Sequence, residues 1–369
     1  MTFTPCATRP RMRFLLITLI FPIIGLTTGC RNSTNSEGNP TQSNERKARI
    51  ELASFIPASV TVLGEQIVHI ADQLDRVSGG SISMKIHDPG ALVGALEILE
   101  AVSDGKVDAG YGASGFWAGK IPAAPLFSAI PFGPDSAEFM AWLYHGNGLE
   151  LYQEMYDQSG FEVKVLVCSI ISPETSGWFA QEIKSPADLK NLKIRFFGLG
   201  GTVMEKLIVS VKVLPGAEIF PALEKGVIDA TEYALPSIDE NQGFHKLVKY
   251  NYFPGWHQLS TTFELILNQR VWDNLSSTQQ AQIESVCKAG IVHSIAYSEA
   301  TQAAAIRRNQ ERDVHIKQWS PEMLALFETT WEKVAKEQST QDPFFKKVWS
   351  DLKSFRADYA TWGDRAYIR

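Results

Sequence analysis

Arg195 is the residue of this sequence whose type and position point most directly to chemistry. It lies in the segment KIRFFGLGGTVMEKL, in which an apolar run ends at glycines and a helix-like sequence follows. Ligands of α/β sheets bind at the carboxyl ends of strands, beside helix N-termini. An arginine there can hold a carboxylate through paired, charge-assisted hydrogen bonds that lysine does not reproduce. The alternatives are a salt bridge to a facing lobe and an edge arginine in solvent.

Few patterns typical of catalytic centres occur elsewhere in the sequence. It contains no HExxH, CxxC, GxSxG or Walker A pattern, and its seven histidines are scattered. Cys168 and Cys287 are the cysteines beyond the N-terminal region, and two cysteines do not make a disulfide framework. We expect both to be buried thiols, with a single bridge between them as the alternative. The sequence therefore favours a protein that is not an enzyme.

The N-terminal region is typical of a targeting segment. Three arginines and no acidic residue precede the apolar run FLLITLIFPIIGLTTGC, which ends at Cys30. A basic region before a short apolar run indicates a signal peptide over residues 1–30, and the run is short for a membrane span. The ending LTTGC is similar to a bacterial lipobox and predicts lipidation of Cys30, with ordinary cleavage nearby as the alternative. Residues 31–46 are polar, as a linker would be.

Length and composition predict two globular lobes. The chain has 369 residues, 44% of them hydrophobic, with nine Trp and twenty Phe, which is enough for a core in each of two domains. The formal net charge of −6 argues against nucleic acid as a partner. It does not exclude an anionic ligand, because one buried arginine can outweigh a diffuse surface field.

Apolar periodicity predicts two α/β units followed by helices. In the first unit, strands over 49–55 and 81–88 flank a helix, and residues 91–112 read as a helix, a glycine turn and a strand. This βαβαβ order predicts a parallel sheet covered by helices. The predicted helix has one apolar face, made of Leu63, Ile67, Ile70, Leu74 and Val77.

The second unit repeats the same order. It begins with a strand over 163–171, and a helix is expected to start at Ser185. Strand 260–268 is long enough to span both lobes, and the chain is almost entirely helical from Ser276 onward. Further strands and helices are predicted over 192–197, 201–210, 211–214, 216–226 and 227–233.

Several segments, in order, resemble the solute-binding proteins of tripartite ATP-independent periplasmic (TRAP) transporters. They are GALEILEAVSDGKVDAGYG with FWAGKIPAAPLF and IPFG, SPETSGWF, LKNLKIRFFGLGG, LPGAEIFPALEKGVIDATEY, and YFPGWHQ with LNQRVW. The resemblance covers about residues 47–369 and is strongest to the branch that binds 2-oxo acids such as pyruvate and 2-oxobutyrate. It implies a periplasmic receptor, without catalysis, that delivers a small 2-oxo or 2-hydroxy monocarboxylate to a TRAP permease.

The resemblance also implies a type II periplasmic binding fold, an α/β fold with two lobes, hinge-crossing strands and a helical C-terminal extension. The expected division is lobe I over 47–165 plus about 258–315, lobe II over 166–257, and C-terminal helices over 316–369. These helices carry many aromatic residues at steps of three and four. In the oxo-acid branch such a helix packs on a second subunit, so a homodimer is expected, with a helix folded back on its own lobe as the alternative.

Residues that match the family positions define the expected site. Arg195 matches the arginine that clamps the ligand carboxylate. A metal ion is expected to bridge ligand and protein, held by Glu232, the backbone of Tyr233, and Gln258. Glu174 falls where some members of the family carry Gln. It is expected to bind the ion and the substrate, with a position further from the ion as the alternative.

Aromatic residues are expected to wall the same pocket. They come from Phe55 and from the loop Ser114, Gly115, Phe116 and Trp117. Each large aromatic side chain has core packing as its alternative. His257 is expected to make a structural hydrogen bond, with donation to the ligand as its alternative.

Charge balance does not decide which metal ion binds. The ligand carboxylate, Glu174 and Glu232 supply three negative charges, whereas Arg195 and sodium supply two positive ones. Either Glu174 is protonated, or the ion is Ca²⁺, or Glu174 points away. Na⁺ is favoured on the resemblance, with Ca²⁺ as the alternative. A lipid-anchored sensor and a hydrolase or lyase that uses the same cleft are the alternative functions.

Overall fold

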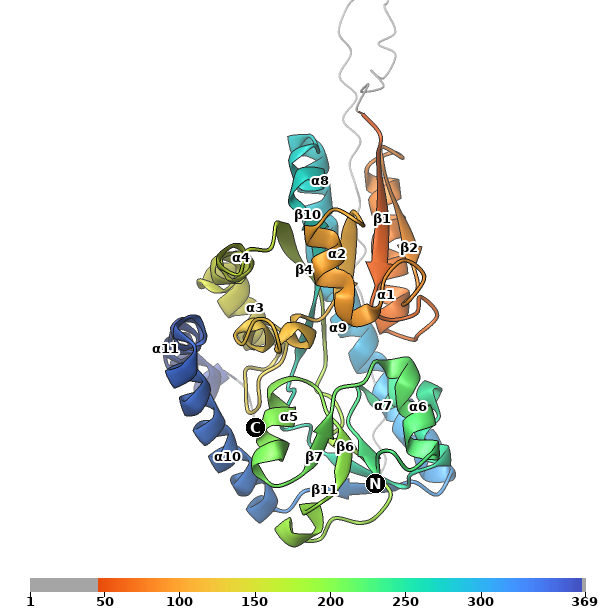
Figure 1. The fold of residues 1–369 in the computed structure, drawn as a ribbon, viewed down its shortest axis with the longest axis vertical. Helices are drawn as coiled ribbons and strands as arrows, with labels where there is room; N and C mark the ends of the chain where they lie inside the picture. Colours follow the sequence, from red (N-terminus) through yellow and green to blue (C-terminus); the bar gives the residue numbers. More distant parts are fainter. Residues whose placement is uncertain (1–45, 367–369) are drawn as a thin grey trace, which may run out of the picture. The chain divides into compact units, whose positions relative to one another are not determined.

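A computed structural model describes residues 46–366 of the chain (Figure 1). The predicted signal peptide, the lipidation of Cys30 and nearly all of the predicted linker lie outside the described residues. No helix among residues 46–366 combines the length and the apolarity that a membrane crossing requires.

The first sheet contains five strands in the order β2-β1-β3-β10-β4. Strands β1, β2 and β3 are parallel, as predicted, but β10 runs antiparallel to both β3 and β4, so the sheet is mixed. Helices α1 and α9 pack beside this sheet, with α2 against β3 and β10. The strands are β1 (Ala48–Ser54), β2 (Ile82–His87), β3 (Ala109–Gly112), β4 (Val163–Ile171) and β10 (Thr261–Asn268); the helices are α1 (Leu63–Val77), α2 (Ile98–Ser103) and α9 (Ser277–Glu311).

Two sequence-based assignments of strands to lobes are wrong. Strand β4 does not begin the second unit, because its whole length pairs with β10 in the first sheet. Strand β10 does not span both lobes, because its ladder partners are β3 and β4. The chain passes to the second sheet after Ile171 and returns before Thr261. The numbered lobe boundaries themselves stay a prediction.

The second sheet contains six short strands in the order β11-β9-β5-β8-β6-β7. The helix expected at Ser185 is a single 3-10 turn, Pro186–Leu189, and Asn191 then takes a positive φ of 63° that no helix continues. The strands are β5 (Gly177–Phe179), β6 (Lys193–Arg195), β7 (Ser210–Lys212), β8 (Ala230–Thr231), β9 (Tyr250–Phe253) and β11 (His315–Gln318); the helices are α5 (Gly198–Lys206), α6 (Gly216–Glu224) and α7 (Pro236–Gln242).

Helix α9 connects the two lobes. Its 35 residues begin at a Ser276 cap that accepts a hydrogen bond from the Gln279 amide. It packs on α1 and β4 of the first lobe and on α7 and β11 of the second, and it runs through the middle of the molecule (Figure 1). One helix therefore contacts elements of both lobes.

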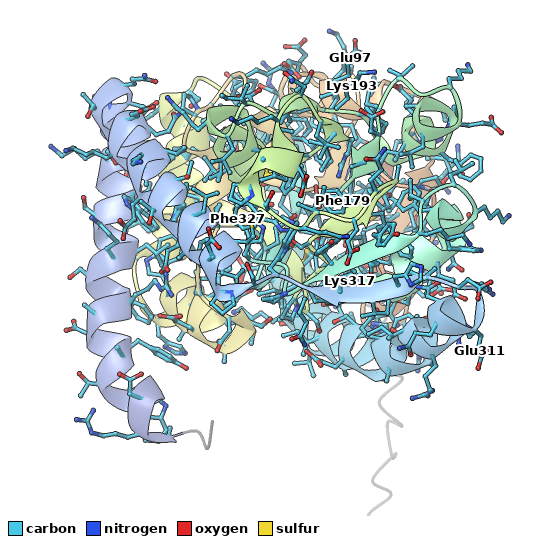
Figure 2. All side chains as sticks on the ribbon, turned by 90° about the horizontal axis from the view of Figure 1, so that it is seen from below. Glu97, Phe179, Lys193, Glu311, Lys317 and Phe327 are labelled. Carbon is cyan, nitrogen blue, oxygen red and sulfur yellow. A yellow bond between two sulfur atoms is a disulfide. The ribbon has the colours of Figure 1, made fainter. Side chains whose placement is uncertain are left out.

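Two helices complete the chain at its carboxyl end. Helix α10 (Pro321–Gln341) packs on α5 and α11, and α11 (Pro343–Ala366) also touches α3 (Ser136–His145) and α4 (Gly148–Gln158) of its own chain. Phe179 and Phe327 lie among the packed elements, whereas Glu97 and Glu311 lie at the periphery (Figure 2). The remaining short helix is α8 (Gln269–Asp273).

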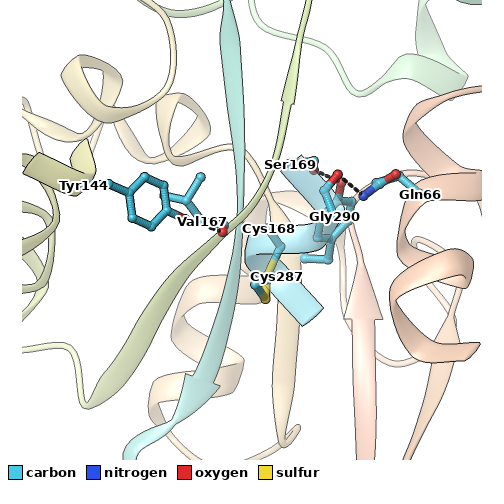
Figure 3. Close-up of a disulfide and its surroundings, with 8 residues drawn as sticks. Gln66, Tyr144, Val167, Cys168, Ser169, Cys287 and Gly290 are labelled. Carbon is cyan, nitrogen blue, oxygen red and sulfur yellow. Dashed lines mark hydrogen bonds between the residues drawn. A yellow bond between two sulfur atoms is a disulfide. The ribbon is translucent and has the colours of Figure 1, made fainter. Parts of the chain in front are cut away.

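A disulfide joins Cys168 of β4 to Cys287 of α9 (Figure 3). The expectation of two buried thiols is therefore wrong. The strand and the helix pack closely at this point, since Gly290, one turn further along α9, lies against the Cys168 carbonyl. The bridge fits an oxidising compartment, because disulfides persist outside the cytosol.

Candidate functional site

A small cavity of about 30 Å³ lies where the two lobes meet. This volume is far below the roughly 300–1,000 Å³ of pockets for drug-sized ligands, so it suits a ligand of few atoms. Its wall combines aromatic rings with a few polar groups. The first lobe contributes Phe55, Leu63, Ala113, Phe116, Thr261 and Phe263, and the remaining wall comes from Glu174, Arg195, Phe197, Tyr233 and Gln258.

Arg195 is the last residue of β6 and is buried beside this cavity. Its Nη1 donates to the Glu232 carbonyl at 2.6 Å and to the Glu232 carboxylate at 3.0 Å, and its Nε donates to the Leu214 carbonyl at 3.2 Å. The guanidinium lies 5.3 Å from the centre of the Tyr233 ring. Nη2 has no hydrogen-bond partner among residues 46–366. A buried, rigidly held guanidinium therefore keeps a donor for a ligand.

Glu232 is the acidic partner of Arg195. It follows β8 and is fully buried, and its Oε2 also accepts from the Phe197 amide at 3.0 Å. Burial opposes ionisation of this carboxyl, but the Arg195 charge and the nearby His257 outweigh it and hold the pKa of Glu232 below its usual range. Glu232 is therefore a buried carboxyl group that favours its charged form.

Glu174 has the opposite electrostatic character. It follows β4 on the connection to the second sheet, and its Oε1 accepts from Thr261 Oγ1 at 3.0 Å. Burial, together with the neighbouring charge of Glu232, raises the pKa of Glu174 well above its usual range. The two carboxyl groups thus lie close together with one favouring the charged form and the other the neutral form.

Gln258 lies between these two carboxyl groups. With its amide nitrogen turned toward them, it reaches Glu232 Oε1 at 3.0 Å and Glu174 Oε2 at 3.2 Å, and its oxygen lies 2.9 Å from Thr261 Oγ1, where it competes with Glu174 Oε1 for the single hydroxyl proton. In the opposite orientation the amide oxygen faces the same acidic atoms. That arrangement of converging oxygens is favourable around a cation, or when a protonated Glu174 donates to the amide oxygen.

The donor atoms around Gln258 fit a metal ion. Atoms of Glu174, Glu232 and His257 that could bind metal lie within 4.8 Å of one another, and all three residues are buried. The Tyr233 carbonyl accepts no hydrogen bond within residues 46–366, so it too is available. Carboxylate, amide and carbonyl oxygens are the donors that Na⁺ and Ca²⁺ prefer.

His257 is the member of this group for which sequence reasoning favoured a structural hydrogen bond, with donation to the ligand as the alternative. Its Nε2 lies 3.5 Å from Glu232 Oε1, and its ring meets Phe196 edge-on at 4.9 Å between centres. Its Nδ1 is buried with no hydrogen-bond partner among the described residues. The position of His257 next to Gln258 in the sequence was the one indication that it could belong to the site. Sequence adjacency does not show which way the imidazole ring points.

The expected aromatic wall is present only in part. Phe55 and Phe116 line the cavity with their ring centres 5.2 Å apart. Ser114 and Trp117 do not line it: the Ser114 hydroxyl donates to the Ala124 carbonyl at 2.8 Å, and the Trp117 indole donates to Glu264 at 2.9 Å. Gly115 faces the ring of a residue that sequence reasoning did not select, Phe197.

Phe197, Leu63 and Phe263 are the main wall residues that the sequence did not reveal. Phe197 meets Phe116 edge-on at 4.6 Å between ring centres and so joins the lobes across the cavity. Its position two residues after Arg195 was the available signal, because alternate residues of an extended chain share a face. Trp178, Trp256 and Phe196 are buried core residues.

Asp239 ties together the two segments that carry the acidic residues. It accepts from the Trp178 indole at 2.8 Å and from the Thr175 hydroxyl at 3.2 Å on one side, and from the Ala234 amide at 3.1 Å on the other. Burial raises the pKa of Asp239 to about 7. Asp239 therefore adds to the contacts between the segments after β4 and β8, which include the bond from the Thr175 amide to the Ala234 carbonyl and the pairing of β5 with β8.

Known proteins resemble this chain over most of its described length. The family model for bacterial extracellular solute-binding protein, family 7, matches residues 53–342. The monocarboxylate 2-oxoacid-binding periplasmic protein of Nostoc sp. (strain PCC 7120) is 31% identical over 337 residues, which is 91% of this chain and 92% of that protein.

Two solved structures share the arrangement of lobes. A TRAP transporter solute-binding protein from Bordetella bronchiseptica, with copurified calcium and picolinate, is 29% identical, with a TM-score of 0.85 over 87% of this chain and 95% of that one. A TRAP periplasmic solute-binding protein from Pseudoalteromonas atlantica, with bound sodium and pyruvate, is 28% identical, with a TM-score of 0.83 over 87% of this chain and 97% of that one.

Proposed function

Because the chain belongs to the family 7 bacterial extracellular solute-binding proteins, we propose that it is an extracytoplasmic receptor for a small 2-oxo or 2-hydroxy monocarboxylate. Its partner is a TRAP permease in the membrane, to which it delivers the acid. The 31% identity to a receptor of monocarboxylate 2-oxoacids and the similarity to a pyruvate-bound structure support this ligand class.

The observation that carries the proposal is the buried Arg195 guanidinium, fixed on two sides with Nη2 free beside a small cavity. A single carboxylate satisfies this donor. Most of the remaining wall is aromatic or aliphatic and none of its other residues is basic, so a second negative charge on the ligand would have no second arginine or lysine to pair with. The site therefore favours a short acid with an apolar tail.

A metal ion completes the proposed site. Glu174, Glu232, Gln258 and the Tyr233 carbonyl would hold it, and it would supply positive charge to the carboxylate and the 2-oxo oxygen of the ligand. Na⁺ is favoured and Ca²⁺ is the alternative; similar structures contain each of them. Phe55 and Phe116 would cover the ligand tail.

The lobes would close on the ligand by hinge motion, because contacts across the cavity exist only when the lobes meet. Phe116 of the first lobe touches Phe197 of the second, and Asn241 donates to Thr61 at 2.6 Å across the same gap. Two further parts of the proposal lie away from the cavity: lipidation of Cys30 as a membrane anchor, and a homodimer formed through α11, on which Trp362 is 63% exposed.

A thermal melt of the protein lacking residues 1–30 tests the proposal. The melt is run with pyruvate, 2-oxobutyrate or lactate, each with Na⁺, Ca²⁺ or chelator, after removal of copurified ligand by unfolding and refolding. Ligand at 100 times its Kd stabilises by about 2.7 kcal/mol, or roughly 2–4 °C in a chain of this size. We expect a shift that needs both an acid and an ion and is lost in Arg195→Lys. A flat response to every combination would refute the ligand class.

A further inference from the structure

Glu264 is a buried acidic residue that the proposed binding chemistry does not use. It lies in β10, is 1% exposed, and belongs to a strand whose other described residues are also buried. Three donors surround its carboxyl group. The Trp117 indole donates to Oε1 at 2.9 Å, the Tyr152 hydroxyl donates to Oε2 at 2.6 Å, and the Tyr156 hydroxyl lies 2.7 and 2.8 Å from the two oxygens.

Only one of these donors is next in sequence to a residue of the cavity wall. Trp117 ends the 3-10 turn Ser114–Trp117, and the preceding residue, Phe116, lines the cavity. Tyr152 and Tyr156 lie on α4, which contributes nothing to the cavity lining. The Trp117 hydrogen bond therefore connects a fixed carboxyl group in the lobe core to the back of the turn.

The front of the same turn is the surface on which the second lobe closes. Phe116 packs edge-on against Phe197, and the Cα of Gly115 faces the same ring so closely that a β-carbon would overlap it. The turn is thus held from behind by Glu264 and meets Phe197 in front. Its placement decides whether the Phe197 ring can reach its closed position.

Glu264 also sits beside a second wall residue. Its neighbour Phe263 lines the cavity, and the pairing of β10 with β4 is irregular between these two residues. Burial raises the pKa of Glu264 to about 6, whereas the donors act in the opposite direction. A strand that only had to fill the core would be expected to carry an apolar residue here, because burying a carboxyl group costs free energy even when it is hydrogen-bonded.

We propose that Glu264 is a positioning residue for ligand capture, which acts through the Trp117 indole to hold the turn Ser114–Trp117 in the form that closes on Phe197. This inference rests on the proposed function for its ligand, but not for its effect on the turn. The competing explanation is that Glu264 only satisfies the polar groups of three buried aromatic side chains.

Matched substitutions separate the two explanations. Trp117→Phe removes the donor that belongs to the turn, and Tyr156→Phe removes a donor that α4 contributes to the same carboxyl group. Trp142→Phe controls for the loss of an indole, because Trp142 is equally buried and donates to Asp351 at 2.8 Å on α11. Glu264→Gln removes the charge but is the variant with the greatest risk of misfolding.

Two measurements decide the outcome. The first is the Kd for pyruvate in the presence of the ion, for which we expect about a tenfold loss in Trp117→Phe, or about 1.4 kcal/mol, and less than a twofold change in the two controls. The second is hydrogen exchange of the amides of residues 114–118 in the ligand-free protein, which should accelerate in Trp117→Phe alone.

Equal losses in Trp117→Phe and Tyr156→Phe, or no change in either measurement for Trp117→Phe, would overturn the proposal. The exchange measurement needs no ligand. If the wild-type protein bound none of the acids, the proposed function would fail, while the exchange comparison would still decide the role of Glu264.

Discussion

Replacing Gly115 by Ala should block closure of the lobes without disturbing either lobe. A β-carbon at this position would overlap the Phe197 ring, which belongs to the opposite lobe. The φ angle of Gly115 is not in the left-handed region, so alanine adds no backbone strain of its own. The clash therefore exists only when the two lobes meet.

The size of the effect follows from the crowding. Overpacking of a well-filled site costs typically 1–3 kcal/mol. Because the ligand-free protein can relieve this clash by opening, the cost should appear in ligand binding and not in folding. An energy of 1–3 kcal/mol corresponds to roughly a 5- to 150-fold increase in Kd.

Isothermal titration with pyruvate in the presence of the ion measures that change, and melting of the ligand-free protein measures stability. Gly119→Ala is the matched control, since its β-carbon would meet no atom within 4 Å. We expect Gly119→Ala to bind like the wild type and both variants to melt within 1–2 °C of it when ligand-free. Wild-type affinity in Gly115→Ala would refute the claim that Phe197 closes onto this turn.

The remaining predictions concern the disulfide and two buried carboxyl groups. Replacing Cys168 and Cys287 together by Ala removes a cross-link between residues 119 apart. The free energy of unfolding should fall by about 4–5 kcal/mol, which is measured as a lower melting temperature. Equal melting temperatures of the variant and the oxidised wild type would contradict this prediction. Asp239 has a pKa raised from 3.8 to about 7, so the stability that its protonation provides is complete below pH 3.8 and lost as the pH rises through 7. In Asp239→Asn, the melting temperature should depend less on pH over this range than in the wild type. An unchanged dependence would show that other groups determine how stability varies with pH. Glu174→Gln should shift ion preference toward Na⁺ in a titration of Na⁺ against Ca²⁺ with pyruvate present, and unchanged selectivity would remove Glu174 from the ion site.

Local periodicity predicted the helices and strands better than it predicted which strands pair with one another. The apolar steps from Leu63 to Val77 define a helix with the bounds of α1, because a 3.6-residue repeat has only one structural solution. Strands β4 and β10 read as buried strands, which they are. The sequence pattern of a buried strand does not show which strand it pairs with. Strand β4 was assigned to the wrong lobe and β10 to both lobes, because their antiparallel pairing joins segments about 100 residues apart.

In the candidate site, the sequence predicted which residues come together better than it predicted where their side chains point. Arg195, Glu174, Gln258, Phe55 and Phe116 come together around one cavity, although their binding roles stay predictions. The turn Ser114–Trp117 was expected to face the ligand as a whole. A 3-10 turn has three residues per turn, so its side chains point in different directions, and Phe116 faces the cavity while Trp117 faces the lobe core.

The disulfide lay beyond the reach of the sequence for another reason. Two cysteines give no spacing pattern, and their pairing depends on β4 and α9 packing side by side, which only the fold determines. A predicted signal peptide already indicated an oxidising compartment. That argument raises the odds of a bridge in general, but it cannot say that the two thiols meet.

On the proposed function, the two acidic groups explain why acid and ion should bind together. Arg195 and Glu232 form a buried ion pair, and burial together with the Glu232 charge favours the neutral form of Glu174, so these three groups together carry little net charge. A carboxylate that entered alone would leave one uncompensated negative charge, which is costly in a buried site. One Na⁺ restores neutrality without further change, whereas Ca²⁺ does so only if Glu174 loses its proton. Since ionisation of Glu174 is opposed by burial and by Glu232, calcium binding should weaken as the pH falls, whereas sodium binding should not.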